Sequence, residues 1–70
     1  MPICFAQVNE ELTIKKVLVD DKTKRHFESL GIVPNNKITL VSVNAGNVIV
    51  IVKGVRLALN KDLASRILVA

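Results

Sequence analysis

The side chains best suited to covalent chemistry in this chain are its single cysteine, Cys4, and its single histidine, His26. A nucleophilic enzyme needs a nucleophile, a base and a group that orients the base. Nothing in the sequence brings Cys4 to His26, and such sites require demanding geometry. We therefore predict no catalytic residues and interpret Cys4 as a small buried hydrophobic residue and His26 as a helix-surface residue.

The carboxylates most relevant to metal binding form two adjacent pairs, Glu10-Glu11 and Asp20-Asp21. Non-haem ferrous iron typically requires two imidazoles and a carboxylate, which one histidine cannot supply. Neighbouring residues on an extended strand also point to opposite faces. We interpret these pairs as a solvated turn and a helix cap, and predict neither metal ligands nor a cofactor. The three glycines are isolated from one another and form no phosphate-binding loop.

The chain carries ten Lys and Arg against six Asp and Glu, for a net charge of +4. Such an excess suits an anionic partner, or simply keeps a small domain soluble. One basic cluster opens the predicted helix: Lys22, Lys24 and Arg25. A second group follows later: Lys53, Arg56, Lys61 and Arg66. Without Tyr or Trp, the aromatic platforms that stack bases or bind proline-rich peptides are missing, so the sequence argues against nucleic acid and favours a protein partner.

The firmest local prediction is a helix over Lys22 to Leu30, capped by the two preceding aspartates. Phe27 and Leu30 lie three apart and share one face of this helix. Gly31 is expected in the left-handed conformation that closes a helix, and Pro34 prevents its continuation. The cap, the apolar face and the stop signals agree with one another.

The rest of the chain has the pattern of short strands, although the segment Ile3 to Val8 fits an irregular arm as well as a strand. Four strands are predicted, over Leu12 to Val19, Lys37 to Val43, Val48 to Val52 and Val55 to Leu59. A helical turn capped by Asn60 and a last strand at 68–69 follow. Alternation in the first strand is imperfect, with Ile14 and Leu18 assigned to the same side. So many strands in so few residues must curl to cover their edges, which predicts one domain over residues 1–70, mainly β with one short helix, in a small partly open β-barrel.

The strand Val48 to Val52 is apolar on both faces. A strand with one solvated face should alternate, so its outer face must be covered. The helix could cover it, or a partner or second subunit could dock there, with Ile49 and Ile51 as contacts if they are exposed. A homodimer formed through a strand edge is a further arrangement that this pattern allows.

The cellular location is predicted from features that the sequence lacks. One cysteine cannot form a disulfide within the chain, so no oxidising compartment is implied. The N-terminus lacks the basic and apolar regions of a secretory signal, and no apolar run is long enough to span a bilayer. We expect a cytoplasmic protein that meets a membrane only indirectly.

The features that remain form an ordered set. They are Arg25 to Ile32 at the helix end, Pro34, the hairpin from Val48 through Gly54 to Leu59, and the closing residues Ala64, Ile67 and Val69. Together they make the chain resemble the FeoA family, ferrous-iron transport protein A, over about Leu12 to Ala70. Asn35 stands where that family usually has glycine, but asparagine tolerates the left-handed region, so the turn is expected to survive.

The resemblance implies an SH3-like barrel and a regulatory role in bacterial ferrous-iron uptake, without enzymatic activity. The implied partner is FeoB, a membrane transporter whose cytosolic part binds GTP, and the contact would be protein–protein binding. The candidate docking residues are Lys22, Lys24, Arg25, Ile49 and Ile51. Because the same barrel ends many iron-dependent repressors, the alternative is a free-standing regulatory or nucleic-acid-binding barrel.

Overall fold

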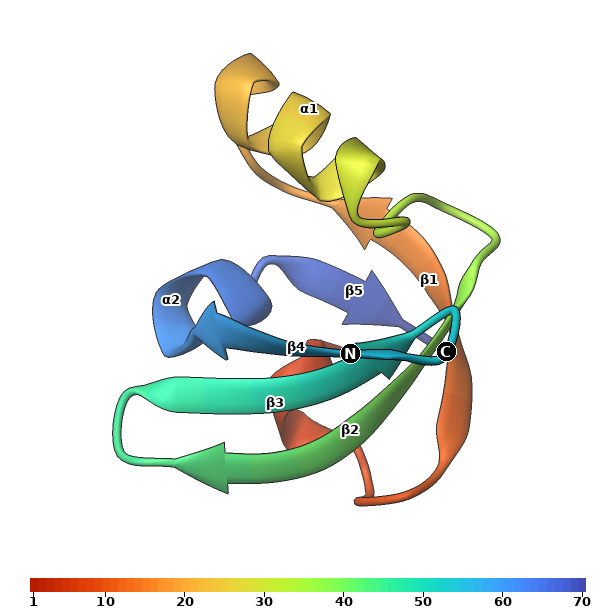
Figure 1. The fold of residues 1–70 in the computed structure, drawn as a ribbon, viewed down its shortest axis with the longest axis vertical. Coiled ribbons are helices and arrows are strands. Elements are labelled where there is room, and N and C mark those ends of the chain that lie inside the picture. The colour runs from red at the N-terminus through yellow and green to blue at the C-terminus, as the bar shows by residue number, and fades with distance from the viewer.

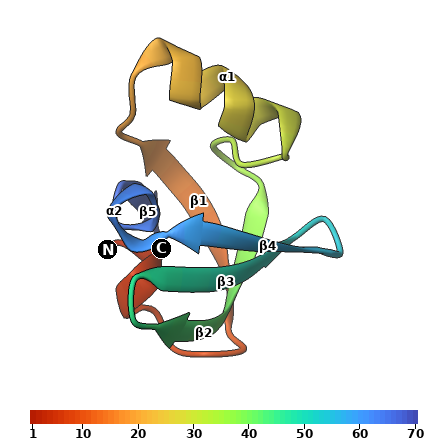
Figure 2. The ribbon, with the colours of Figure 1, turned by 60° about the vertical axis from the view of Figure 1, so that its left-hand side comes forward.

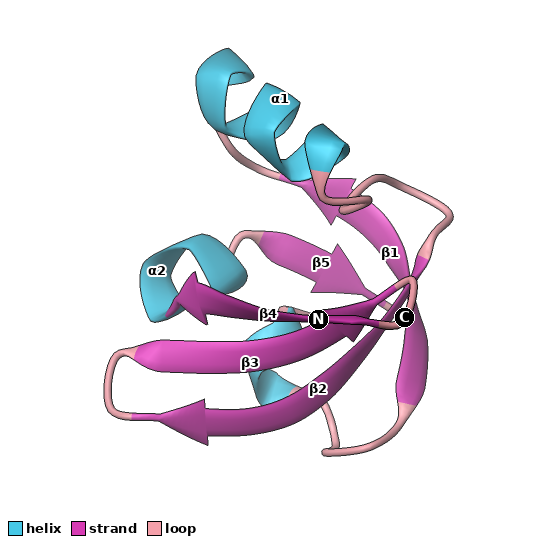
Figure 3. Cartoon of the chain, in the orientation of Figure 1, coloured by secondary structure: helices cyan, strands magenta, loops and turns pink.

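The chain forms one antiparallel sheet of five strands that curls around an aliphatic core without closing (Figures 1 and 3). The computed structural model describes all residues, 1–70. The strand order is β4-β3-β2-β1-β5. The strands are β1 (Glu11–Val17), β2 (Lys37–Asn44), β3 (Asn47–Val52), β4 (Val55–Asn60) and β5 (Ile67–Val69). The helices are the 3₁₀ turn η1 (Ile3–Phe5), α1 (Asp21–Ser29) and α2 (Lys61–Ala64). The predicted mainly β fold is therefore confirmed, with α1 as its one helix of more than a single turn and η1 and α2 as short helical turns.

Strand β1 pairs with two different neighbours along its length. Its first half, Glu11 to Thr13, pairs with β2, and its second half, from Ile14 to Val17, pairs with β5. The register shifts between Ile14 and Lys16, which is the mark of a β-bulge. The prediction that Ile14 and Leu18 share one side is wrong: Ile14 is fully buried, whereas Leu18, beyond the bulge, is 44% exposed. Val17 instead packs against the core.

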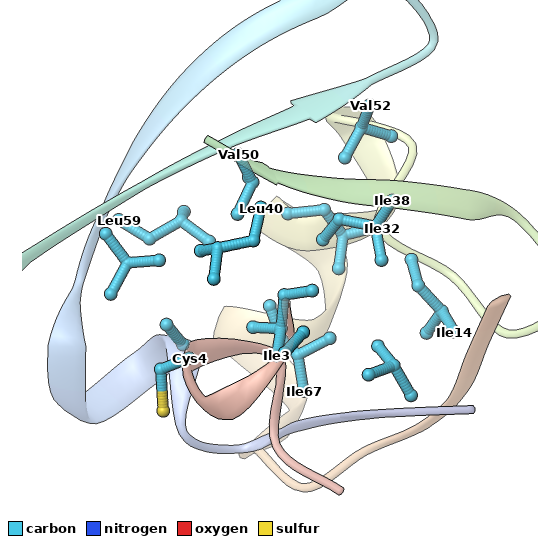
Figure 4. Close-up of a cluster of buried hydrophobic side chains, with 14 of the residues drawn as sticks. Ile3, Cys4, Ile14, Ile32, Ile38, Leu40, Val50, Val52, Leu59 and Ile67 are labelled. Atoms are coloured by element: carbon cyan, nitrogen blue, oxygen red, sulfur yellow. The ribbon is translucent and has the colours of Figure 1, made fainter. Parts of the chain in front are cut away.

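The core is almost entirely aliphatic and lies on the concave side of the sheet (Figure 4). Val48, Val50 and Val52 of β3 are fully buried. Figure 4 shows Val50 and Val52 on the same side as core residues from β2, η1 and β5. No polar or charged residue is buried. Aliphatic β-branched side chains suit this position because they pack well on a pleated surface.

The N-terminal segment, which the sequence left open between a strand and an arm, is neither a regular strand nor a free arm. Residues Ile3 to Phe5 form the turn η1, and Ile3 is fully buried in the core. Pro2 forms an isolated bridge with Leu68 of β5. This segment therefore fills one side of the open barrel.

Helix α1 begins and ends as its capping residues predict. The Asp20 carboxylate accepts a hydrogen bond of 2.9 Å from the Thr23 N–H. At the other end, Ile32 N–H donates to the Phe27 carbonyl at 2.9 Å, across Gly31, whose φ of +88° is left-handed. This is a Schellman closure, in which glycine is favoured because it lacks a Cβ. Asn35 also adopts a left-handed conformation, with a φ of +78°, as expected for the turn.

Helix α1 does not cover β3, contrary to one of the two coverings expected from the sequence. It stands away from the strands at one end of the barrel (Figures 1 and 2). Its one buried side chain, Phe27, reaches into the core and is 1% exposed. The short loops on either side of α1 place it beyond the end of β1, so only its last turn approaches β3, where a Cβ on Gly31 would lie 3.3 Å from Val52 Cγ1.

The two phenylalanines form a matched pair for testing this packing. Phe27→Ala removes the side chain that joins α1 to the core and should lower the free energy of unfolding by about 3–5 kcal/mol. Phe5, which is 72% exposed, should change it by less than about 0.5 kcal/mol when replaced by alanine. Urea denaturation measures both, and equal losses would contradict the assignment of Phe27 to the core.

A second pair separates backbone strain from crowding. Gly31→Ala and Gly46→Ala both place a side chain in the left-handed region, at φ of +88° and +83°, which costs about 1–2 kcal/mol. Only at Gly31 does the new methyl group meet a neighbour, Val52, since nothing lies within 4 Å at Gly46. Gly31→Ala should therefore have the lower melting temperature. The reverse order would mean that Gly31 does not pack against β3.

Candidate functional site

The two side chains suited to covalent catalysis lie in different environments. Cys4 is buried among aliphatic side chains in η1 (Figure 4). His26 is exposed on α1, which projects from the other end of the molecule (Figure 1). The structure does not bring them together, and both interpretations from the sequence, a buried cysteine and a helix-surface histidine, are confirmed.

The Asp20-Asp21 pair has the helix-cap role expected of it. Asp20 is the N-cap of α1, and hydrogen bonding by the side chain and the backbone N–H of Thr23 holds the pKa of Asp20 below its usual value. Asp21 lies in the first helical turn, where its negative charge interacts favourably with the positive end of the helix dipole. Glu10 and Glu11 are both solvated as expected, but Glu11 is the first residue of β1 and not part of a turn. No three His, Cys, Asp or Glu side chains are grouped closely enough to hold a metal ion.

The predicted cationic docking residues Lys22, Lys24 and Arg25 are all exposed on α1. Because α1 projects from the barrel (Figure 2), these side chains stand on the most protruding element of the molecule. The helix also exposes two carboxylates, Asp21 and Glu28, so its surface is mixed in charge with an excess of cations.

The predicted apolar docking residues Ile49 and Ile51 are half-buried on the outer face of β3. Ile49 lies opposite Ser42 and Ala58 in the neighbouring strands, and Ile51 lies opposite Thr39 and Arg56. These neighbours shield the two isoleucines only in part. The two isoleucines lie on β3, whereas the three cations lie on α1. The structure therefore does not gather the five predicted residues into one site.

Two hollows in the surface adjoin α1. The first, of about 580 Å³, lies between the start of α1 and α2; it is lined by Val17, Leu18, Val19, Asp20, Thr23, Leu63 and Arg66. The second, of about 340 Å³, lies between the end of α1 and the β3–β4 hairpin; it is lined by Glu28, Ser29, Leu30, Gly31, Val52, Lys53, Val55 and Leu57. We call the second one the hairpin hollow.

The hairpin hollow is lined in part by two residues of β4. Val55 and Leu57 lie on the inner face of the sheet, since they pair with the buried Val52 and Val50. Nevertheless Val55 is 55% exposed and Leu57 is half-buried. The cause is the position of β4 at the edge of the sheet, which no local pattern reveals.

None of the helices has the length and hydrophobicity needed to cross a bilayer.

Comparison with known proteins places this architecture in a family. The family model described as the FeoA domain matches residues 1–70. The Fe(2+) transport protein A of Methanocaldococcus jannaschii is 31% identical over 68 residues, covering 97% of this chain and 83% of that protein.

Solved structures agree on the fold. A crystal structure of an iron uptake regulatory protein (FeoA) superimposes with a TM-score of 0.87 at 24% identity, covering 99% of this chain and 93% of that one. The solution structure of the FeoA protein from Chlorobium tepidum gives a TM-score of 0.89 at 18% identity, covering 99% of this chain and 68% of that one. The barrel is thus of the SH3-like type predicted, and the chain belongs to the FeoA domain family.

Proposed function

We propose that this protein is a cytoplasmic accessory protein of ferrous-iron uptake that regulates a FeoB-type transporter by binding its cytosolic part. The match of the FeoA domain model to residues 1–70 is the observation that carries the proposal. A relative that covers nearly the whole chain bears the name Fe(2+) transport protein A. Iron is then the cargo of the transporter and needs no site on this chain.

The surface of the molecule supports binding more than catalysis. The nucleophile Cys4 and the base His26 lie apart, and the larger hollow is open, with exposed Leu18 among its lining residues. Exposed apolar side chains beside charged ones are typical of protein interaction surfaces. The excess of positive charge further favours a partner surface with acidic character.

The cations of α1 are the first contacts that we propose. Lys22 and Arg25 are three residues apart and therefore share one face of the helix. Exposed on a projecting element, they can meet an acidic surface without disturbing the barrel. Charges placed at the rim of an interface chiefly raise the rate of association. Ile49 and Ile51 on the outer face of β3 would add a separate apolar contact.

Charge reversal on α1 tests the proposal. The double variant Lys22→Glu with Arg25→Glu should bind the transporter's purified cytosolic domain about tenfold more weakly than the parent, mostly through slower association. Surface plasmon resonance at two salt concentrations measures both rate constants. The difference between variant and parent should shrink at high salt, because screening weakens exposed charges.

The matched control reverses two exposed lysines of β1, Lys15→Glu with Lys16→Glu, and changes the net charge by the same amount. If this control weakens binding as much as the α1 variant, the effect comes from net charge and α1 is not the docking element. If the folded parent binds no cytosolic domain at all, the proposed function is wrong.

A further inference from the structure

The two edges of the open sheet differ in whether another segment covers them. The β5 edge is covered, because the Val69 N–H donates to the Met1 carbonyl at 2.7 Å and the Met1 ammonium donates to the Val69 carbonyl at 3.2 Å. Pro2 adds a bridge to Leu68. The opposite edge is β4, which pairs only with β3. None of the turn, loop and cap backbone hydrogen bonds involves residues 55–60.

The turn of the β3–β4 hairpin fixes which groups of β4 are unpaired. Lys53 and Gly54 form a two-residue turn in which both φ angles are positive, 52° and 76°. In such a hairpin the residues that flank the turn, Val52 and Val55, exchange both of their backbone hydrogen bonds. Hydrogen-bonded and non-hydrogen-bonded pairs then alternate along the two strands.

Arg56 and Ala58 occupy the non-hydrogen-bonded positions, opposite Ile51 and Ile49. Their N–H and C=O groups therefore point away from β3, along an edge where no other segment pairs with them. Both residues are exposed. Such a row of unpaired donors and acceptors is a template for an added strand.

The side chains around this edge indicate the chemistry of the strand it fits. On the inner side, Val55 and Leu57 border the hairpin hollow and remain partly exposed. Along the edge, the segment from Lys53 to Lys61 carries three cations, including Arg56, and no carboxylate. The acids around this segment lie at its margins: Glu28 across the hollow, Glu11 in a separate hollow beside Lys53 and Gly54, and Asp62 beyond the strand. The complementary strand has apolar residues at alternate positions and acidic residues between them.

Charge opposes a second copy of this chain at the edge in most central registers. In an antiparallel self-pairing centred on Leu57, Lys53 of each copy would lie opposite Lys61 of the other. Centring the pair on Arg56 would set the two arginines against each other, whereas centring it on Ala58 would place no two cations directly opposite. Like charges opposite one another destabilise strand pairing, and each copy carries a net charge of +4. Charge therefore favours a foreign acidic segment.

We infer that β4 is a docking edge, to which an extended, acidic and alternately apolar segment of the partner adds as a sixth strand. The inference rests on the proposed function, since the partner is the transporter's cytosolic part, and it names the surface and the chemistry of the contact. Main-chain hydrogen bonds to Arg56 and Ala58 supply the pairing. The hairpin hollow takes the partner's apolar side chains, and Arg56 meets its acids.

Amide exchange in the free protein gives a first test. The Arg56 and Ala58 amides should exchange at the rates of unprotected amides, whereas those of Val55, Leu57 and Leu59 should be protected by their bonds to β3. Nuclear magnetic resonance of dilute protein resolves this alternation. Protection of Arg56 and Ala58 under these conditions would show that the edge is already occupied, and would overturn the inference.

Proline at position 58 tests docking itself. Ala58→Pro removes an N–H that has no partner within the chain, and proline is tolerated on edge strands. Its ring also fixes φ at position 58 and restricts the backbone of Leu57. The control Ala58→Val adds the same number of side-chain carbons but keeps the N–H. Circular dichroism and a thermal melt check that both are folded. The proline variant should bind the transporter's cytosolic domain at least about tenfold more weakly, and the valine variant within about threefold of the parent.

The outcomes distinguish this inference from the function on which it rests. If Ala58→Pro binds as tightly as Ala58→Val, docking does not use β4, while the proposed function stands. If the parent does not bind the domain, both fall. A parent that dimerises with concentration, and an Ala58→Pro variant that stays monomeric, would identify the occupant as a second copy and would overturn the acidic-segment proposal.

Discussion

The pairing of one strand with two neighbours determines the shape of this protein. β1 gives its first half to β2 and its second half to β5, and the bulge between Ile14 and Lys16 allows the change of partner. A strand shared in this way bends the sheet, since bulges increase local bend and twist. The curled sheet encloses an aliphatic core small enough for a chain of 70 residues to fill. The strand order leaves β4 and β5 as the two edges of this sheet.

Local rules in the sequence predict local structure well here. The caps and stop of α1 depend on Asp20, Thr23 and Gly31, which are neighbours in the chain and act through backbone hydrogen bonds. The β3–β4 hairpin follows from strand propensity around Lys53-Gly54. In each case the residues that cause the structure lie within a few positions of it, so the pattern can be recognised without knowing the fold.

The features that sequence reasoning missed depend on contacts between distant segments. Leu18 was assigned to the wrong face because the bulge in β1 arises from pairing with β5, some fifty residues later. The covering of β3 was left open, because the direction in which α1 leaves the barrel depends on the whole end of the sheet. The exposure of Val55 and Leu57 follows from the strand order. The candidate site is made of such features, so its residue types were foreseeable but its arrangement was not.

Lys53 illustrates how a folding cost and a binding surface can share one residue. Its left-handed φ of +52° is a conformation in which asparagine or glycine would be less strained. The lysine lines the hairpin hollow and also a smaller hollow that it shares with Glu11, Lys37 and Ile51. A sequence optimised for thermal stability alone would place a smaller residue there, and the molecule would then lose the cation at the rim shared by its hairpin and its helix. The strained turn is thus a place where this domain gives up some stability in favour of surface charge.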